Sequence, residues 1–354
     1  SRSRSRRERE EGSHLHFYIH TGLSAPMEEK SAAFIPVVDL SQETQVIVEA
    51  VRAACSGPGF MYLKNTGMCP REIHTMFQQS AAFFALPEQE KRLYAWGSTG
   101  YPNTGYVAML QEALDPASGS RDPKEAFNVT APAWCGLQGR NSPSQSVLPP
   151  QEMLPELQPT LCSFFQRCQE LTERLLRYFA LALGLPEDHL IPLHRIDEPT
   201  GTTLRLLHYP PVPLPDGEEE SLNSIRAGEH SDYGSLTLLF QDDIGGLQVF
   251  HKESEEFVDA IPIPDTVVVN TGDLMQHWSG GRFTSTVHRV CSRGQGRRHR
   301  YSIAFFSHPN DSVPLLPLVE EDTKGLSGQP EEDQSSVTVL TAGEYLSQKL
   351  SASY

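Results

Sequence analysis

Residues 228–235, with the sequence GEHSDYGS, place a histidine and an aspartate two positions apart. In an extended strand, side chains two positions apart point to the same face, so His230 and Asp232 present an imidazole and a carboxylate together. A third ligand is available downstream, because His288 lies within the β-rich run Thr286–Val290. Two histidines and one carboxylate on one side of a metal leave three adjacent positions open, as in iron(II) oxygenases. Catalytic zinc sites use the same ligands, so the residues alone leave the metal open between iron(II) and zinc.

A second pair of polar residues, Arg300 and Ser302, follows His288 in the next β-rich run. A guanidinium fork beside a hydroxyl on one face of a strand suits a single bound carboxylate. Tyr209, at the end of an earlier strand, can add a phenol donor. Taken singly, these residues have ordinary explanations as a core histidine, a turn cap or part of the basic run 297–300. Their joint order and spacing predict a metal site next to a carboxylate clamp.

The composition excludes several classes of protein. The chain has 354 residues, 38% hydrophobic and 21% charged, which is ordinary for a globular protein. A net charge of −16 argues against nucleic acid and against anionic lipid as partners. No apolar run reaches the roughly 20 residues that span a bilayer. We therefore expect a small-molecule substrate, no nucleic acid and no membrane, and a monomer.

Cysteine usage and the N-terminus predict the compartment. The six cysteines are scattered, without a C-x-x-C pair, and are typical of free thiols in a reducing compartment. The first residues, SRSRSRRERE, lack the apolar segment of a signal peptide. We expect a cytoplasmic protein, and hypothesise that Met27 is the natural start of the chain.

Composition and periodicity divide the chain into five parts. We expect a disordered tail over 1–34, a mixed α/β region over 35–150, backing helices over 151–200, a β-rich core over 201–310 and a C-terminal segment over 311–354. Within 97–150, the many Gly, Pro, Asn and Ser residues predict loops with few regular elements. Helical spacing predicts helices over 42–56, 71–85, 88–94 and about 158–183, and the apolar stripe of the last predicts a helix that backs a sheet. Strands are predicted over Phe60–Leu63, Thr203–Tyr209, Ser235–Phe240, Gly246–Phe250, Phe257–Ile261, Thr266–Asn270, Thr286–Cys291 and Arg300–Phe306.

Several short motifs resemble one known family, the isopenicillin N synthase-like family of iron(II)/2-oxoglutarate-dependent oxygenases, also called the iron/ascorbate-dependent oxidoreductases. The resemblance runs from about Ile35 to Tyr354 and is specific for the family, but not for one substrate. The motifs are Ile35–Leu40, Gly59-Phe60, Asn65–Gly67, Phe83–Pro87, Leu207–Pro210, His230–Gly234, Leu238–Asp242, Gly245–Val249, Asn270–Asp273, Thr286–Val290 and Arg300–Ser302.

This resemblance implies a mainly β fold with flanking helices, in which a double-stranded β-helix (jelly-roll) core over 201–310 is backed by a long helix. It implies iron ligands, a clamp for the distal carboxylate of 2-oxoglutarate, and residues that line the pocket near iron. Tyr106 and Phe127 suggest an aromatic-lined mouth, although core packing explains them equally well. The implied ligands are His230, Asp232 and His288, the implied clamp is Arg300, Ser302 and Tyr209, and the implied pocket residues are Asn270 and Phe305.

The activity implied by the resemblance is oxidation, such as hydroxylation, of a small molecule coupled to oxidative decarboxylation of 2-oxoglutarate. Iron(II), 2-oxoglutarate and dioxygen are then required, and ascorbate is expected to support turnover. One alternative is an iron(II) oxidase that uses no 2-oxoglutarate and binds its substrate's carboxylate with the Arg-x-Ser pair. Two others are a non-catalytic jelly-roll binding module and a zinc hydrolase, which would need a general base of the H-E-x-x-H type that this sequence lacks. Substrate specificity is expected from the loops 97–130 and the segment 311–354.

Overall fold

The computed structural model describes residues 34–97, 103–130, 148–211, 224–292, 296–319 and 339–353. The predicted disordered tail, apart from Phe34, and the hypothesis about Met27 lie outside these residues.

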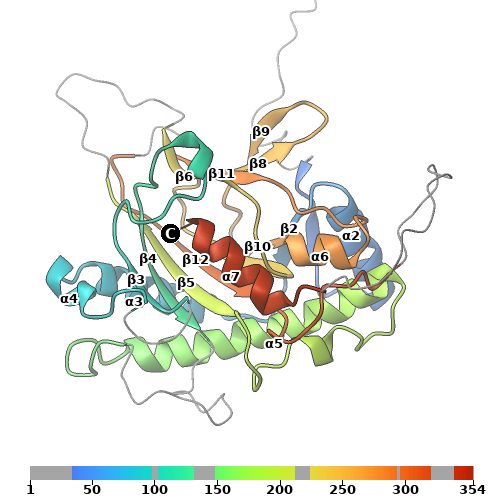
Figure 1. Cartoon of the computed structure of the whole chain (residues 1–354), viewed down its shortest axis with the longest axis horizontal. Coiled ribbons are helices and arrows are strands. Elements are labelled where there is room, and N and C mark those ends of the chain that lie inside the picture. The colour runs from blue at the N-terminus through green and yellow to red at the C-terminus, as the bar shows by residue number, and fades with distance from the viewer. Residues whose placement is uncertain are drawn as a thin grey trace, which may run out of the picture.

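Two β-sheets form the core of the molecule (Figure 1). All strand pairs are antiparallel except β1 with β2, and the sheets have eight and four strands. This arrangement confirms the predicted mainly β fold with a jelly-roll core. In order across the larger sheet, the strands are β1 (Val37–Asp39), β2 (Phe60–Lys64), β10 (Val267–Thr271), β7 (Leu236–Gln241), β12 (Arg300–Ser307), β5 (Thr203–Tyr209), β4 (Glu125–Thr130) and β3 (Gly105–Val107). The smaller sheet contains β6 (Ile225–His230), β11 (His288–Cys291), β8 (Leu247–His251) and β9 (Glu256–Asp259).

Helices cover the larger sheet on the side away from the smaller one. The longest, α5 (Leu157–Leu183), runs along that face (Figure 1). Its Phe164 and Phe165 rings meet Phe240 and Phe305 of the sheet at centroid distances of 5.0 Å each, which confirms the predicted backing helix. The other helical elements are α2 (Thr44–Ser56), α3 (Pro70–Phe84), α4 (Glu88–Arg92), η1 (Pro116–Ser118), η3 (Ile191–Leu193), α6 (Asp273–Trp278) and α7 (Ala342–Ser353).

The stretch 97–150 was predicted to be loops with few regular elements, and its described residues contain two strands, β3 and β4, that the sequence did not locate. The sequence of β4, EAFNVT, carries Glu125 and Asn128 in a strand that is buried on both faces. Both polar side chains are accommodated because they have partners: Lys91 Nζ lies 2.6 Å from Glu125 Oε2, and Asn128 donates to Asn103. Such partners come from distant parts of the chain, so the polar residues concealed the strand. The helices α6 and α7 were also not predicted, and of β6 only the extended backbone around His230 was.

Two further expectations concern the cysteines and membranes. Cys55, Cys69, Cys168 and Cys291 carry thiols that are not joined in disulfides, as expected. The expectation is wrong for Cys162, which is disulfide-bonded; the sequence spacing gave no sign of this pairing. Among the described helices, none combines the length and the apolar character that a membrane crossing requires.

Candidate metal centre

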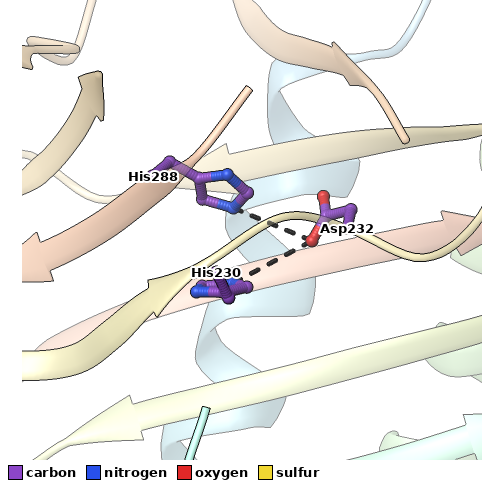
Figure 2. Close-up of side chains that lie close together, drawn as sticks. All are labelled: His230, Asp232 and His288. Carbon is purple, nitrogen blue, oxygen red and sulfur yellow. Dashed lines mark ion pairs between the residues drawn. The ribbon is translucent and has the colours of Figure 1, made fainter. Parts of the chain in front are cut away.

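His230, Asp232 and His288 come together at one end of the smaller sheet (Figure 2). His230 is the last residue of β6, His288 is the first of β11, and the two residues are directly opposite in the antiparallel register. Asp232 Oδ1 lies 4.0 Å from His230 Nε2 and 3.7 Å from His288 Nε2. The sequence pattern suggested that strand alternation places Asp232 beside His230. Asp232 instead lies beyond the end of β6, so the loop after the strand sets its position.

Backbone carbonyls set the orientation of both imidazoles. His230 Nδ1 lies 2.7 Å from the Gly228 carbonyl oxygen, and His288 Nδ1 lies 3.0 Å from that of Thr286. Each Nδ1 therefore donates a proton, which leaves the Nε2 lone pair free to bind a metal. The Phe60 ring packs against His288 in a T-shaped arrangement at a centroid distance of 5.3 Å. The two ligand atoms are thus fixed before any metal arrives.

The Asp232 carboxylate is held through one of its oxygens. Oδ2 accepts hydrogen bonds from Thr237 Oγ1 at 2.6 Å and from Asn270 Nδ2 at 2.7 Å. Oδ1 is the oxygen that faces the two imidazoles. Burial alone would raise the pKa of Asp232, but the two histidines and these hydrogen bonds lower it below its ordinary value. Burial, with His288 nearby, lowers the pKa of His230 to about 4. An ionised carboxylate and a neutral imidazole are the forms that bind a divalent metal.

Backbone hydrogen bonds connect the turn between β10 and α6 to the loop that carries Asp232. The Asp273 amide donates to the Asp232 carbonyl at 2.8 Å, and the Gly272 amide donates to that of Ser235 at 3.1 Å. A Cβ atom on Gly272 would lie 2.3 Å from the Gly234 carbonyl oxygen and 2.9 Å from that of Asp232. Only glycine allows this close approach, which explains the glycine of the Asn270–Asp273 motif.

Arg300 lies in the same cavity as the three candidate ligands and is buried. Its Nε donates to the Gly245 carbonyl at 2.5 Å and its Nη1 to Ser302 Oγ at 3.3 Å. Its guanidinium lies over the Tyr209 ring, 4.7 Å from the centroid, because Arg300 and Tyr209 are paired across β12 and β5. These contacts within the described residues include no carboxylate. The guanidinium is therefore positioned to take an anionic ligand.

The other predicted pocket residues divide into two groups. Asn270 lines the cavity and holds Asp232, as described above. Phe305, Tyr106 and Phe127 do not line it. They belong to the core on the helix side of the larger sheet, where Phe305 meets Phe165 and both other rings meet Phe83. Strand alternation explains the difference, since the neighbours of Phe305, Ala304 and Phe306, face the cavity.

Sequence reasoning missed three charged residues that line the cavity, namely Glu112, Lys124 and Arg205. Of these three, only Arg205 has a sequence signal that could have identified it, because it places a charge inside the otherwise uncharged strand sequence Thr203–Leu207. Part of α7 also borders the cavity; it lies within the segment 311–354 from which specificity was expected, but its residues Leu346, Leu350 and Ser353 were not singled out.

Comparisons with known proteins agree with this geometry. The model of the 2OG-Fe(II) oxygenase superfamily matches residues 200–309, and the model of the N-terminal region of the non-haem dioxygenase in morphine synthesis matches 35–153. A UPF0676 protein of Schizosaccharomyces pombe is 35% identical over 325 residues, covering 90% of this chain and 92% of that protein. The 2-oxoglutarate-dependent dioxygenase citB of Monascus ruber is 30% identical, covering 93% and 98%. A Neurospora crassa protein solved in complex with alpha-KG and thymine is 31% identical, with a TM-score of 0.71, covering 90% and 96%.

Proposed function

The chain belongs to the 2OG-Fe(II) oxygenase superfamily, and on that premise we propose that His230, Asp232 and His288 bind iron(II) and that Arg300 and Ser302 bind 2-oxoglutarate. The protein is an iron(II)- and 2-oxoglutarate-dependent dioxygenase, and it acts on a small molecule. Tyr209 completes the proposed clamp through the face of its ring.

One observation carries the assignment of residues. A buried guanidinium without a carboxylate partner among the described residues shares a cavity with two imidazoles and a carboxylate whose ligand atoms lie within 4.8 Å of one another. A buried cation without an ion-pair partner is costly, so the arrangement favours an anionic ligand that spans from Arg300 toward the metal. 2-Oxoglutarate has a carboxylate at each end and fits this requirement.

The protein's own residues prepare the reaction. Bound iron(II) supplies the redox chemistry by which dioxygen and 2-oxoglutarate give succinate and carbon dioxide, with one oxygen atom transferred to the substrate. The Gly228 and Thr286 carbonyls hold His230 and His288 so that their Nε2 atoms face the metal site, and Asn270 and Thr237 orient Asp232. Arg300 fixes the distal carboxylate, and the apolar side chains of Leu207, Leu239 and Leu247 exclude water between the sheets.

The oxidase alternative assigns the Arg-x-Ser pair to a carboxylate of the substrate. Membership of the superfamily and the 2-oxoglutarate-dependent relative support the first assignment. The thymine bound by the Neurospora crassa relative suggests heterocycles as first candidates for the substrate. Ascorbate is expected to support turnover by keeping iron reduced.

The test measures succinate and carbon dioxide from labelled 2-oxoglutarate, with purified protein, iron(II), dioxygen and a panel of heterocycles as candidate substrates. We expect both products in equal amounts from the wild type and none from Asp232→Ala, which should also fail to retain iron. A variant of a distant surface carboxylate, Glu198→Gln, is the matched control. Substrate oxidation that consumes dioxygen without forming succinate would refute the proposal and favour the oxidase.

A further inference from the structure

The cavity has a second end, opposite the proposed clamp. On β5, the side chains of Arg205, Leu207 and Tyr209 share the face that lines the cavity. Arg205 lies four residues from Tyr209, which corresponds to about 13 Å along a strand. A cation therefore lies near each end of the cavity, Arg300 beside Tyr209 and Arg205 at the far end. If 2-oxoglutarate occupies the first end, as proposed above, the substrate has the second.

Carboxylates compensate the cations at the second end. Arg205 contacts both oxygens of Glu112, at 3.1 and 2.6 Å. Lys124 Nζ lies 2.9 Å from Glu112 Oε2 and 2.5 Å from Asp122 Oδ2. All four side chains are buried. Two positive and two negative charges sum to zero. Burial alone would raise the pKa of Glu112, but Arg205 and Lys124 hold it well below its ordinary value, so Glu112 is ionised at neutral pH.

The summed charge of the buried side chains distinguishes the two ends of the cavity. Arg300 forms no ion pair among the described residues, and Asp242 is the carboxylate that interacts with it at longer range, so Arg300 can select an anion, whereas Arg205 and Lys124 each pair directly with carboxylates. A carboxylate on the substrate would have to displace Glu112 from both of them or lie beside it, and either costs free energy in a buried site. The second end therefore disfavours anionic substrates.

The network still offers hydrogen bonds. Lys124 has three N–H groups, and two of them are used by Glu112 and Asp122 among the described residues. The Glu112 carboxylate has about four acceptor positions, and its three contacts with Arg205 and Lys124 leave one. Both residues line the cavity and are only 3% exposed. An N–H donor and a carboxylate acceptor thus lie side by side at the cavity surface.

Apolar side chains line the cavity together with the ion network. Leu346 and Leu350 of α7 line the cavity together with Leu114. α7 is held in place by the Tyr345 hydroxyl, which donates to Asp273 at 2.9 Å, and by the hydrogen bond of Ser353 Oγ with the Tyr233 hydroxyl, also 2.9 Å. A substrate in the cavity can therefore contact both leucine side chains and the ion network.

We propose that the second end of the cavity binds an uncharged molecule that presents a carbonyl next to an N–H, as in a lactam or cyclic imide. The carbonyl accepts from Lys124, the N–H donates to Glu112, and the apolar remainder packs against Leu346 and Leu350. The inference rests on the proposed function, because it assigns 2-oxoglutarate to the Arg300 end.

Three small probes test it on the anaerobic complex of the protein with iron(II) and 2-oxoglutarate. They are 2-piperidone, its N-methyl derivative, which lacks the N–H, and cyclopentanecarboxylate, an anion of similar size. Binding is measured by ligand-observed NMR, and relaxation of probe protons by iron(II), absent in a zinc-loaded sample, shows that the probe lies near the metal.

We expect 2-piperidone to bind, the N-methyl derivative to bind at least about tenfold more weakly, the effect of one hydrogen bond to a charged group, and the anion not to bind. Binding of the anion alone, equal binding of the two lactams, or binding of none of the probes would overturn the inference. If 2-oxoglutarate itself does not bind, the proposed function fails instead.

Charge variants provide an independent test. Glu112→Gln leaves one net positive charge, so affinity for cyclopentanecarboxylate should rise at least about tenfold. In Glu112→Gln/Lys124→Met the charges again sum to zero and the gain should disappear. Near-UV circular dichroism reports whether each variant folds; if neither does, the wild-type probe series still decides. A folded Glu112→Gln variant that gains no anion affinity would contradict the proposed charge balance.

Discussion

At the scale of single residues, the candidate centre depends on groups that hold the ligands as much as on the ligands. Asp232 offers Oδ1 to a metal because Thr237 and Asn270 occupy Oδ2, and each histidine offers Nε2 because a backbone carbonyl occupies Nδ1. Such supporting contacts typically contribute a factor of about 10–100 in metal affinity.

Thr237→Val removes one hydrogen bond to Asp232 while keeping the shape of the side chain. We expect iron(II) to dissociate about 10–100 times more readily, as measured by competition with a chelator. The strand fold should be preserved, since valine suits β7. Thr75→Val, which removes an exposed hydroxyl on α3, is the control. Equal iron affinity in both variants would show that the Thr237 contact does not support the metal.

Arg300 allows a similar test of the clamp. Arg300→Met removes the guanidinium, and hydrogen bonds to charged groups contribute about 1.5–3 kcal/mol each. The Kd for 2-oxoglutarate should therefore rise about 10–150-fold, while iron remains bound. Arg300→Lys should recover only part of the loss, because an ammonium cannot form the two parallel bonds of a guanidinium. Calorimetry on both variants decides; an unchanged Kd in Arg300→Met means that 2-oxoglutarate binds elsewhere.

At the scale of elements, the junction of β10 and α6 connects the larger sheet to the Asp232 loop. Gly272→Ala should disturb it, because a Cβ would lie 2.3 Å from the Gly234 carbonyl oxygen. The loop must then shift and move Asp232 from the two histidines. We expect loss of iron binding together with a lowered Tm. Gly67→Ala is the contrasting variant, since its Cβ would meet no atom within 4 Å, although its positive φ of 85° adds local strain. Full iron retention in Gly272→Ala would contradict this role.

The wall formed by α7 leads to a different expectation. Leu346→Ala/Leu350→Ala opens the substrate end of the cavity to water but leaves the ligands and the clamp untouched. We expect more succinate to be formed per molecule of substrate oxidised, because the reaction is less well shielded from solvent. Gln348→Ala, on the exposed side of the same helix, is the control. An unchanged ratio of succinate to oxidised substrate would mean that α7 does not seal the cavity.

Elements differ in how well the sequence predicted them. The helix α5 was predicted almost to the residue, because its apolar stripe repeats over many turns and Gly184 ends it with φ of 79°. The strands β5, β7, β10 and β12 were predicted because their residues are mostly apolar and β-forming. β4 and the ion network were not, since Glu125, Glu112 and Lys124 are buried only by virtue of partners far away in the sequence.

On the scale of the whole molecule, the two sheets create the site by facing each other. The larger sheet supplies Arg300, Ser302, Tyr209 and Asn270, and the smaller sheet and its following loop supply the three candidate ligands. Short motifs predicted these residues well. They could not predict which neighbours face the cavity, and Phe305 was misplaced for this reason. The five-part division of the chain, the monomeric state and the cytoplasmic location stay predictions.

The buried charges also set how the stability of the molecule depends on pH. The folded-state pKa of Glu112 lies well below its ordinary value of 4.5, because Arg205 and Lys124 outweigh the effect of burial. A lowered pKa stabilises the folded protein above about pH 4.5, and this contribution is lost as the pH falls toward the folded-state value.

The free energy of unfolding of the metal-free wild type should therefore fall below pH 4.5. Glu112→Gln cannot take up this proton, so its curve should be flatter in that range by up to about 1.36 kcal/mol per pH unit. At neutral pH the variant should be less stable, because it leaves Arg205 and Lys124 partly unpaired. Urea titrations between pH 3.5 and 7 measure both effects, with the surface variant Glu198→Gln as control. Parallel curves for the wild type and Glu112→Gln would mean that the network does not hold Glu112 ionised, and the charge balance at the substrate end would then have to be revised.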